Sequence, residues 1–340
     1  MSDSDIAAIP FAKGFGRGAT GGRGGTNVWK VTNLNTSGAG SYDEALRGEG
    51  GGYVVFDVAG VIRHTGDDYT FIGGSDSNKT IEYATAPGEG IEIQGAELRI
   101  QGSNIIARNG RIRLGPTGSA DTNVDCINIS TFNGAINNIF LDRMSLYYPL
   151  DEAFSTVGSF SSNAGITNVS FTNSIIAHAH YGSLTFKESY GVSHVGNISS
   201  HNDDRDFYSS VHTTSREVIN NIVYDPGETF NVPAGETHDL IGNHFILRQQ
   251  VMMGLSASSV YIRHAVNTFN SPDQTLADSE IYANDNIIEQ VDYLGSPSPI
   301  TEFASNYTDN DRATRNFTTG NFTTPYAASS VIDSVLSTTS

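Results

Sequence analysis

The chain has 340 residues, of which 38% are hydrophobic and only 16% are charged, and its formal net charge is −18. The 37 acidic residues against 19 basic ones exclude a typical nucleic-acid-binding protein, because phosphate neutralisation needs clustered Lys and Arg. No apolar run is long enough to cross a bilayer, which argues against a membrane partner, and a single cysteine excludes an intrachain disulfide. Together with 36 glycines, this composition predicts one all-β domain over residues 1–340, built from short strands and tight turns.

The first predicted element is a short helix that begins after Ser41. Ser41 and Glu44 have the spacing of a capping box at the start of a helix. Short apolar runs bounded by Gly and Asn follow it and predict buried strands. A helix placed before such strands would cover the exposed strand edges at the open end of a stack.

A repeating unit of apolar residues around an asparagine follows these strands. The comparable residues are Asn173, Asn197, Asn221, Asn243 and Asn267, at spacings of 24, 24, 22 and 24 residues. So short and regular a period predicts the coils of a parallel solenoid. We therefore predict a right-handed parallel β-helix with a short N-terminal capping helix, in which the asparagines stack from coil to coil as scaffold.

The end of the chain, about residues 300–340, is polar and rich in Thr, Ser and Asn. We interpret it as a tail or cap that lies along the solenoid. His194 occupies an inward position of the repeat and is predicted to be a core residue rather than an acid or base.

Four polar residues among the repeats could carry chemistry: Asp125, the pair Asp151–Glu152, and Arg205. A coiled strand solenoid can bring these acidic residues and the late Arg together, which suggests chemistry on an acidic sugar. An acidic turn that merely faces water is the simpler interpretation of the pair. An acidic surface also repels an anionic polymer, so binding one would require a local reversal of charge.

Several linked motifs occur along roughly the first 225 residues. They are Phe11-Ala-Lys-Gly-Phe-Gly-Arg-Gly-Ala-Thr-Gly-Gly, Val55-Phe-Asp-Val-Ala-Gly-Val-Ile, Thr85-Ala-Pro-Gly-Glu-Gly-Ile, Leu141-Asp-Arg-Met-Ser-Leu and Asp151-Glu-Ala-Phe-Ser. In this order they resemble the bacterial pectate lyases of the first polysaccharide lyase family. The resemblance implies a calcium-dependent polysaccharide lyase that cleaves a polyuronate such as pectate by β-elimination and leaves 4,5-unsaturated products.

The resemblance also implies roles for individual residues. Asp125 and Asp151 match the family's calcium-binding aspartates, Glu152 lies beside the second, and a further family ligand falls on Ser155. Arg205 matches the arginine assigned in the family as the proton-abstracting base. An ordinary Arg is a poor base, since its pKa exceeds about 12.

The chain departs from the family pattern at its basic residues. The positions of a family Pro and second Arg hold Phe207 and Tyr208, and the family's substrate-binding Lys falls at Tyr181 or Gly182. Lys187 is the candidate replacement and a second candidate catalytic residue. Loss of basic contacts should weaken binding to a polyuronate.

The candidate substrate-binding residues are His178, His180, Tyr181 and Tyr208. The first three follow a strand, where a loop can face a groove, and the tyrosines could stack on sugar rings. Zinc is disfavoured because no close His/Cys ligand pattern occurs.

Two alternatives stay open from the sequence. One is a non-catalytic or receptor-binding carbohydrate-binding β-helix, like a phage tail spike or an adhesion module, which would be virion-associated in the first case and could form a homotrimer. The other is a glycoside hydrolase, which requires two carboxylates at defined separations. The lyase interpretation predicts an acidic polysaccharide substrate, a monomer, and an extracellular protein in a mature form without a visible signal peptide.

Overall fold

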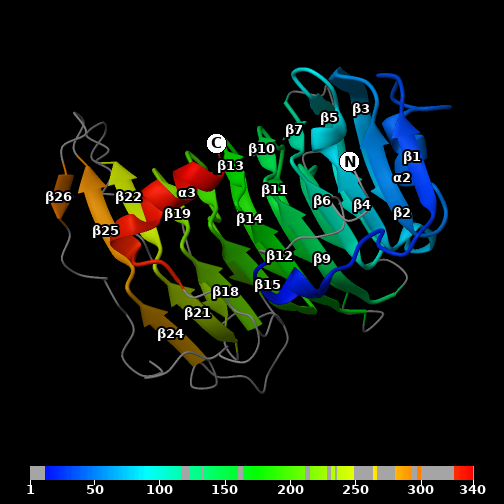
Figure 1. Cartoon of the computed structure of the whole chain (residues 1–340). Coiled ribbons are helices and arrows are strands. Elements are labelled where there is room, and N and C mark those ends of the chain that lie inside the picture. Colours follow the sequence, from blue (N-terminus) through cyan, green and yellow to red (C-terminus); the bar gives the residue numbers. More distant parts are fainter. Residues whose placement is uncertain are drawn as a thin grey trace.

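The computed structural model describes residues 12–115, 123–131, 134–159, 164–210, 215–227, 231–233, 236–248, 263–265, 280–291, 297–299 and 325–339. Within these ranges the chain winds into an elongated parallel β-solenoid (Figure 1). The predicted right-handed parallel β-helix is thus confirmed as the fold class. No helix of the described residues is both long and apolar enough to span a membrane.

The solenoid has three faces, and the first is a ten-stranded parallel sheet. In spatial order its strands are β1 (Asn27–Val31), β2 (Gly52–Phe56), β4 (Lys79–Glu82), β6 (Ile105–Arg108), β9 (Ile136–Asp142), β12 (Ile166–Thr172), β15 (Ser189–Val195), β18 (Ser215–Ile219), β21 (Thr237–Ile241) and β24 (Glu280–Asn284). We call this sheet face 1.

A second, 14-stranded sheet supplies the other two faces, because two long early strands, β3 (Gly60–Ile72) and β5 (Ile91–Ile100), contribute to both. Face 2 contains β7 (Arg111–Arg113), β10 (Ser145–Tyr147), β13 (Ile175–Ala177), β16 (Ile198–Ser200), β19 (Ile222–Tyr224), β22 (His244–Arg248) and β25 (Ile287–Val291), with β26 (Pro297–Pro299) antiparallel at its end. Face 3 contains β8 (Ile127–Ser130), β11 (Glu152–Val157), β14 (Tyr181–Phe186) and β17 (Tyr208–Ser210). A separate pair, β20 (Asn231–Pro233) and β23 (Arg263–Ala265), is also parallel.

Apolar side chains from all three faces fill the interior of the early and middle coils. Phe154 of face 3 stacks on Phe171 of face 1, with ring centroids 4.8 Å apart and both side chains fully buried. Burial of a large apolar side chain contributes about 1.5–3 kcal/mol, so the repeated inward rows account for most of the stability. His194 lies among them, 1% exposed, so the prediction that it belongs to the core is confirmed.

An asparagine ladder fixes the turn between face 1 and face 2. The Nδ2 of Asn197 donates to the Oδ1 of Asn221 at 3.0 Å, and that of Asn221 donates to the Oδ1 of Asn243 at 3.0 Å. The ladder continues from Asn243 to Asn286 at 2.9 Å. Each asparagine therefore satisfies polar groups at the bend, as predicted for scaffold residues.

The predicted ladder is wrong at its first position. In the strand register, Thr172 pairs with Val195, which places Ser174 and not Asn173 opposite Asn197. Asn173 instead adopts a left-handed backbone (φ 49°) one residue earlier, a conformation that Asn tolerates well. Asn267 lies outside the described residues, and the ladder partner of Asn243 is 43 residues away.

The open end of the solenoid carries the predicted helix. Helix α2 (Tyr42–Leu46) begins after Ser41, whose Oγ accepts from the Glu44 N–H at 3.2 Å, while the Glu44 carboxylate accepts from the Gly40 N–H at 2.6 Å. The buried Lys79 Nζ donates to the carbonyls of Leu46 and Gly48 at 2.6 and 2.7 Å and so satisfies the end of the helix. The capping helix is thereby confirmed.

Three short 3₁₀ helices occur between residues 12 and 100, η1 (Phe15–Gly18), η2 (Gly74–Asp76) and η3 (Tyr83–Thr85). Near the end of the chain, η5 (Ala328–Ser330) leads into helix α3 (Val331–Thr339). Val331 and Val335 of α3 pack with Ile222 of β19, so the helix lies along face 2 in Figure 1. The described part of the expected tail or cap is thus helical and covers a side of the solenoid.

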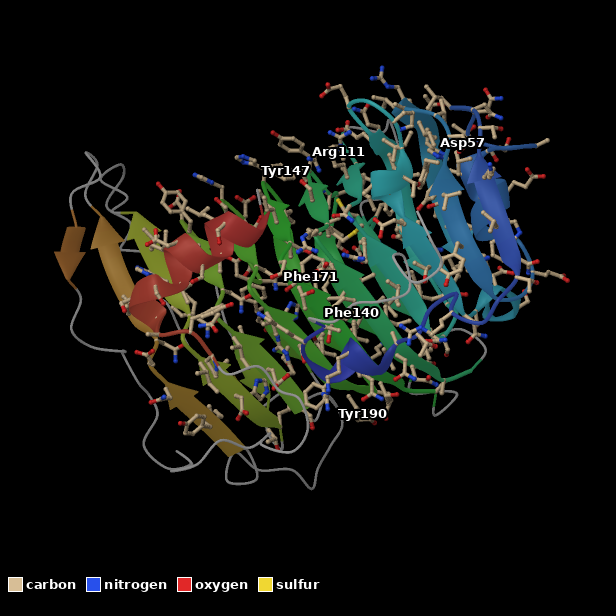
Figure 2. All side chains as sticks on the ribbon, viewed as in Figure 1. Asp57, Arg111, Phe140, Tyr147, Phe171 and Tyr190 are labelled. Atoms are coloured by element: carbon tan, nitrogen blue, oxygen red, sulfur yellow. The ribbon has the colours of Figure 1, made fainter. Side chains whose placement is uncertain are left out.

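Segment η1 covers face 1. The N–H of Phe15 donates to the Oγ of Ser193 at 2.9 Å, and the N–H of Gly16 donates to the Oγ of Ser170 at 2.8 Å. Phe140, which is 2% exposed but lies outside the interior apolar cluster, is buried beside this segment (Figure 2). Because η1 packs on face 1, it does not cover the polar residues of face 3.

Candidate functional site

Three carboxylates converge where the strands of face 3 begin. Asp125 lies two residues before β8, and Asp151 and Glu152 lie at the start of β11 in the next coil. One carboxylate oxygen from each residue lies within 4.8 Å of the others. Asp125 and Glu152 are buried, and Asp151 is half-buried. The structure thus brings together the acidic residues that the sequence singled out.

Asp125 is held rigidly by its neighbours. Its Oδ1 accepts from the Glu152 N–H at 3.0 Å, and its Oδ2 accepts from the Asn128 Nδ2 at 3.0 Å and from the Ser155 Oγ. Burial, followed by the charges of Glu152 and Glu97, raises the pKa of Asp125 well above its ordinary value. Burial and the neighbouring carboxylates therefore both oppose ionisation of Asp125.

Arg205 comes to the same site from the loop before β17. Its Nη1 pairs with the Oε1 of Glu152, and its guanidinium stacks 3.7 Å above the ring of Tyr181 and 5.8 Å from that of Tyr208. Burial alone would lower the pKa of Arg205, but the adjacent Glu152 outweighs it and raises the pKa. Arg205 is therefore a firmly held cation between aromatic rings.

The backbone at Arg205 is unusual. Its φ is 59°, and its carbonyl accepts from the Ser183 N–H of β14 at 2.7 Å. Non-glycine residues seldom adopt this left-handed backbone conformation, and the surrounding contacts maintain it at Arg205. This conformation allows the side chain to reach Glu152 across two coils.

The pKa of Glu152 depends on the charges of Asp151 and Arg205. Burial and then the neighbouring Asp151 raise its pKa, Arg205 opposes them, and the net pKa is about 7. A carboxyl group that changes protonation near neutral pH beside a cluster of charges is typical of functional sites.

The other predicted site residues divide into two groups. Tyr181, Tyr208 and His180 lie at the site, and the ring of His180 is 4.1 Å from that of Tyr181. His178 belongs instead to a row on the corner between faces 2 and 3, where it stacks on Tyr148 at 5.4 Å and on His201 at 5.3 Å. All three residues of this corner row share a left-handed backbone.

Lys187 is not brought to the cluster. It follows the carboxyl end of β14, six residues beyond Tyr181, and its Nζ lies 4.8 Å from the ring of Phe186. At about 3.3 Å per residue, the strand places Lys187 roughly 20 Å from Tyr181. The strand's extended geometry thus separates Lys187 from Arg205.

Two residues of the site were not found from the sequence. Glu97, 1% exposed, accepts from the Asp125 N–H at 3.1 Å and pairs with Arg99 at 2.6 Å. Asn128 donates to both Asp125 and Ser155. Charged residues at alternate positions in a strand, such as Glu97 and Arg99, would have been the signal for an outward polar row.

The cluster fits a calcium ion in its chemistry. All three side chains offer hard oxygen donors, and the buried carboxylates leave an excess of negative charge against the single Arg205. Ser155 is hydrogen-bonded to Asp125 in the place where a fourth acid would add a ligand. A site with three carboxylates is thus present.

Fold and site together define a parallel β-helix protein with three carboxylates and an arginine on one face. No family model matches the chain. Among curated proteins, it is 34% identical to the probable pectate lyase C of Aspergillus flavus over 252 residues, 72% of this chain and 55% of the relative. It is 32% identical to that of Emericella nidulans over 280 residues, 80% and 61% of the two chains. The chain belongs to the pectate lyase family.

The chain spans only a little more than half the length of these fungal relatives. Solved structures confirm the fold over nearly the whole chain. Jun a 1, the major allergen from cedar pollen, superposes with a TM-score of 0.64 at 16% identity, covering 96% of this chain and 92% of the allergen. A Bacillus pectate lyase in complex with trigalacturonate gives 0.61 at 13% identity, covering 96% and 97%. None of these proteins supports the virion-associated alternative.

Proposed function

We propose that the protein is a polysaccharide lyase that cleaves a pectate-like polyuronate by calcium-assisted β-elimination. The observation that carries the proposal is the contact of Arg205 with Glu152 in the three-carboxylate cluster on face 3. The fungal relatives named probable pectate lyase C, and the Bacillus structure with trigalacturonate, support the same substrate class.

Asp125, Asp151 and Glu152 are the residues that would hold calcium. When bound, Ca²⁺ would neutralise the carboxylates, attract the uronate carboxylate, and compete with Arg205 for Glu152, which would lower the pKa of the guanidinium. Asp125 would be fixed for this role by the hydrogen bonds from Asn128 and Ser155.

The reaction removes the proton on C5 of the uronate, alpha to its carboxylate. The electron pair of that C–H bond forms the C4–C5 double bond, the bond from C4 to the glycosidic oxygen breaks, and the leaving oxygen takes up a proton. Arg205 is the proposed acceptor of the C5 proton. Tyr181 and Tyr208, which flank its guanidinium, and the adjacent His180 are the proposed sugar contacts.

The test follows the unsaturated product by its absorbance, with polygalacturonate, with Ca²⁺, and with or without a chelator. Arg205→Ala should lower kcat by at least about 100-fold, the scale of a general base. Arg143→Ala is the matched control, because Arg143 also has a left-handed backbone and pairs with a buried acid, Asp142, but follows the end of β9 on face 1. No product from any uronate polymer would refute the proposal, and full activity of Arg205→Ala would refute only the assigned base.

A second candidate is a carbohydrate-binding β-helix without catalysis. It is favoured by the ion pair between Arg205 and Glu152, which raises the pKa of the proposed base. Trigalacturonate that binds without forming product in the presence of calcium would select this candidate.

The proposal includes an extracellular location, since a polymeric substrate must be met outside the cell. It also includes a monomeric state.

A further inference from the structure

A cavity of about 530 Å³ lies in the early coils, apart from the three carboxylates. It opens where β3 and β5 pass from face 2 to face 3. This volume is within the range of small-molecule sites. Its lining includes Arg63, Glu92, Gln94, Arg113, Gly115 and Tyr148. We call it the corner cavity.

The lining of the corner cavity carries more basic than acidic side chains, unlike the chain as a whole. Two arginines, Arg63 and Arg113, line it against a single carboxylate, Glu92, although acids outnumber bases 37 to 19 in the whole sequence. Clustered guanidinium groups recognise planar anions such as carboxylates. The cavity therefore has the local positive charge that an acidic protein needs in order to bind an acidic ligand.

Both arginines are positioned by neighbouring groups. Arg113 donates from Nη1 to the Ser145 carbonyl at 2.6 Å and from Nη2 to the Ser145 Oγ at 2.9 Å, and its guanidinium lies 4.3 Å from the ring centroid of Tyr147. Arg63 donates from Nε to the Oε1 of Gln94 at 3.1 Å. Figure 2 shows Tyr147 on the outer edge of the solenoid.

One wall residue of the corner cavity, Tyr148, is close in sequence to the candidate site. Tyr148 belongs to its wall, and its carbonyl accepts from the Gly115 N–H at 2.9 Å. Asp151 follows Tyr148 by three residues, so their Cα atoms are at most about 11 Å apart. Tyr148 is 51% exposed and stacks on His178, the next residue of the corner row. Tyr148 therefore links the wall of the cavity to the corner row.

We propose that the corner cavity is an accessory subsite for an acidic sugar residue of the substrate, with Arg63 and Arg113 facing its carboxylate and Tyr148 contacting its ring. The inference rests on the proposed function for the identity of the polymer. It accounts for binding of a polyanion by a chain that lacks the basic residues of the family pattern.

Calorimetry with trigalacturonate tests the subsite without cleavage being required. Arg63→Gln removes an exposed charge and should raise the Kd about three- to tenfold, and the KM for polygalacturonate by a similar factor with kcat unchanged. Arg47→Gln is the matched control, because Arg47 is also a surface arginine but lines a different cavity, of about 570 Å³. Tyr148→Ala, which alters only a half-exposed ring, should weaken binding in the same direction.

The outcomes separate the two proposals. If Arg63→Gln and Arg47→Gln leave the Kd equally unchanged while the chain forms unsaturated product, the subsite is refuted and the lyase stands. If no product forms but Arg63→Gln weakens trigalacturonate binding, the lyase is refuted and the subsite stands. Equal binding of the neutral trisaccharide maltotriose, or no binding of trigalacturonate by the unaltered chain, would also overturn the subsite.

Discussion

Replacement of Asn221 by Ala would test how much the asparagine ladder stabilises the solenoid. Asn221 is fully buried. Its Oδ1 accepts from the N–H and the Nδ2 of Asn197, and its Nδ2 donates to the His194 carbonyl and to the Oδ1 of Asn243, all within 3.0 Å. Each bond contributes about 1 kcal/mol net, and buried groups left without a partner cost more, so the expected loss is about 3–5 kcal/mol.

The assay is urea unfolding followed by far-ultraviolet circular dichroism, combined with hydrogen exchange. Because solenoid coils interact mainly with their neighbours, faster exchange should concentrate in β15, β18 and β21 and leave the early coils unchanged. Asn137→Ala is the control: Asn137 is exposed on β9, and its Oδ1 accepts from the half-buried Asn138 at 3.1 Å. A loss for Asn221→Ala no larger than the control's, about 0.5 kcal/mol or less, would refute the assigned role.

Three further predictions concern buried polar groups. Burial raises the pKa of Asp206 from 3.8 to about 7, and its Oδ2 has no hydrogen-bond partner among the described residues. The folded state therefore binds more protons than the unfolded state between about pH 4 and 7, so stability should fall over this window as pH rises, by about 3–4 kcal/mol for this group. Asp206→Asn should remove that dependence in thermal unfolding, and an identical pH profile would contradict it. His194→Phe should stabilise the fold by about 1–2 kcal/mol. Burial lowers the pKa of His194 well below its ordinary value, and both ring nitrogens lack hydrogen-bond partners among the described residues. A melting temperature lower than that of the unaltered protein would count against this prediction. Ser155→Asp should raise the apparent calcium affinity about tenfold, since it places a further carboxylate beside Asp125. The same added charge should destabilise the protein when calcium is removed by a chelator. A melting temperature insensitive to calcium in both the unaltered chain and the variant would contradict a calcium site.

Sequence periodicity was sufficient to predict the solenoid, but not its register. The spacing of asparagines cannot distinguish Asn173 from Ser174, since only strand pairing shows which residue faces Asn197. The spacing also predicted Asn267 where the ladder uses Asn286, because a coil of 43 residues separates Asn243 from its partner. Inserted residues between strands change the period without changing the fold.

The site was predicted in part, for a similar reason. Asp151 and Glu152 are adjacent in sequence, and resemblance to a family supplied Asp125 and Arg205. The pairing of Arg205 with Glu152 spans 53 residues and depends on the left-handed backbone at Arg205, which no local pattern indicates. Lys187 was proposed from its nearness in sequence to Tyr181, but an extended strand carries neighbours in sequence apart in space.

The segment η1 has a consequence for the order in which the chain folds. Its hydrogen bonds join Phe15 to Ser193 and Gly16 to Ser170, which are 178 and 154 residues later. Contacts of such high sequence separation form slowly, because the entropy of closing the loop must be overcome first. During synthesis, residues 15–18 must wait until β12 and β15 have left the ribosome. The middle coils should therefore assemble before this segment closes over them, so that a segment made before them is among the last to fold.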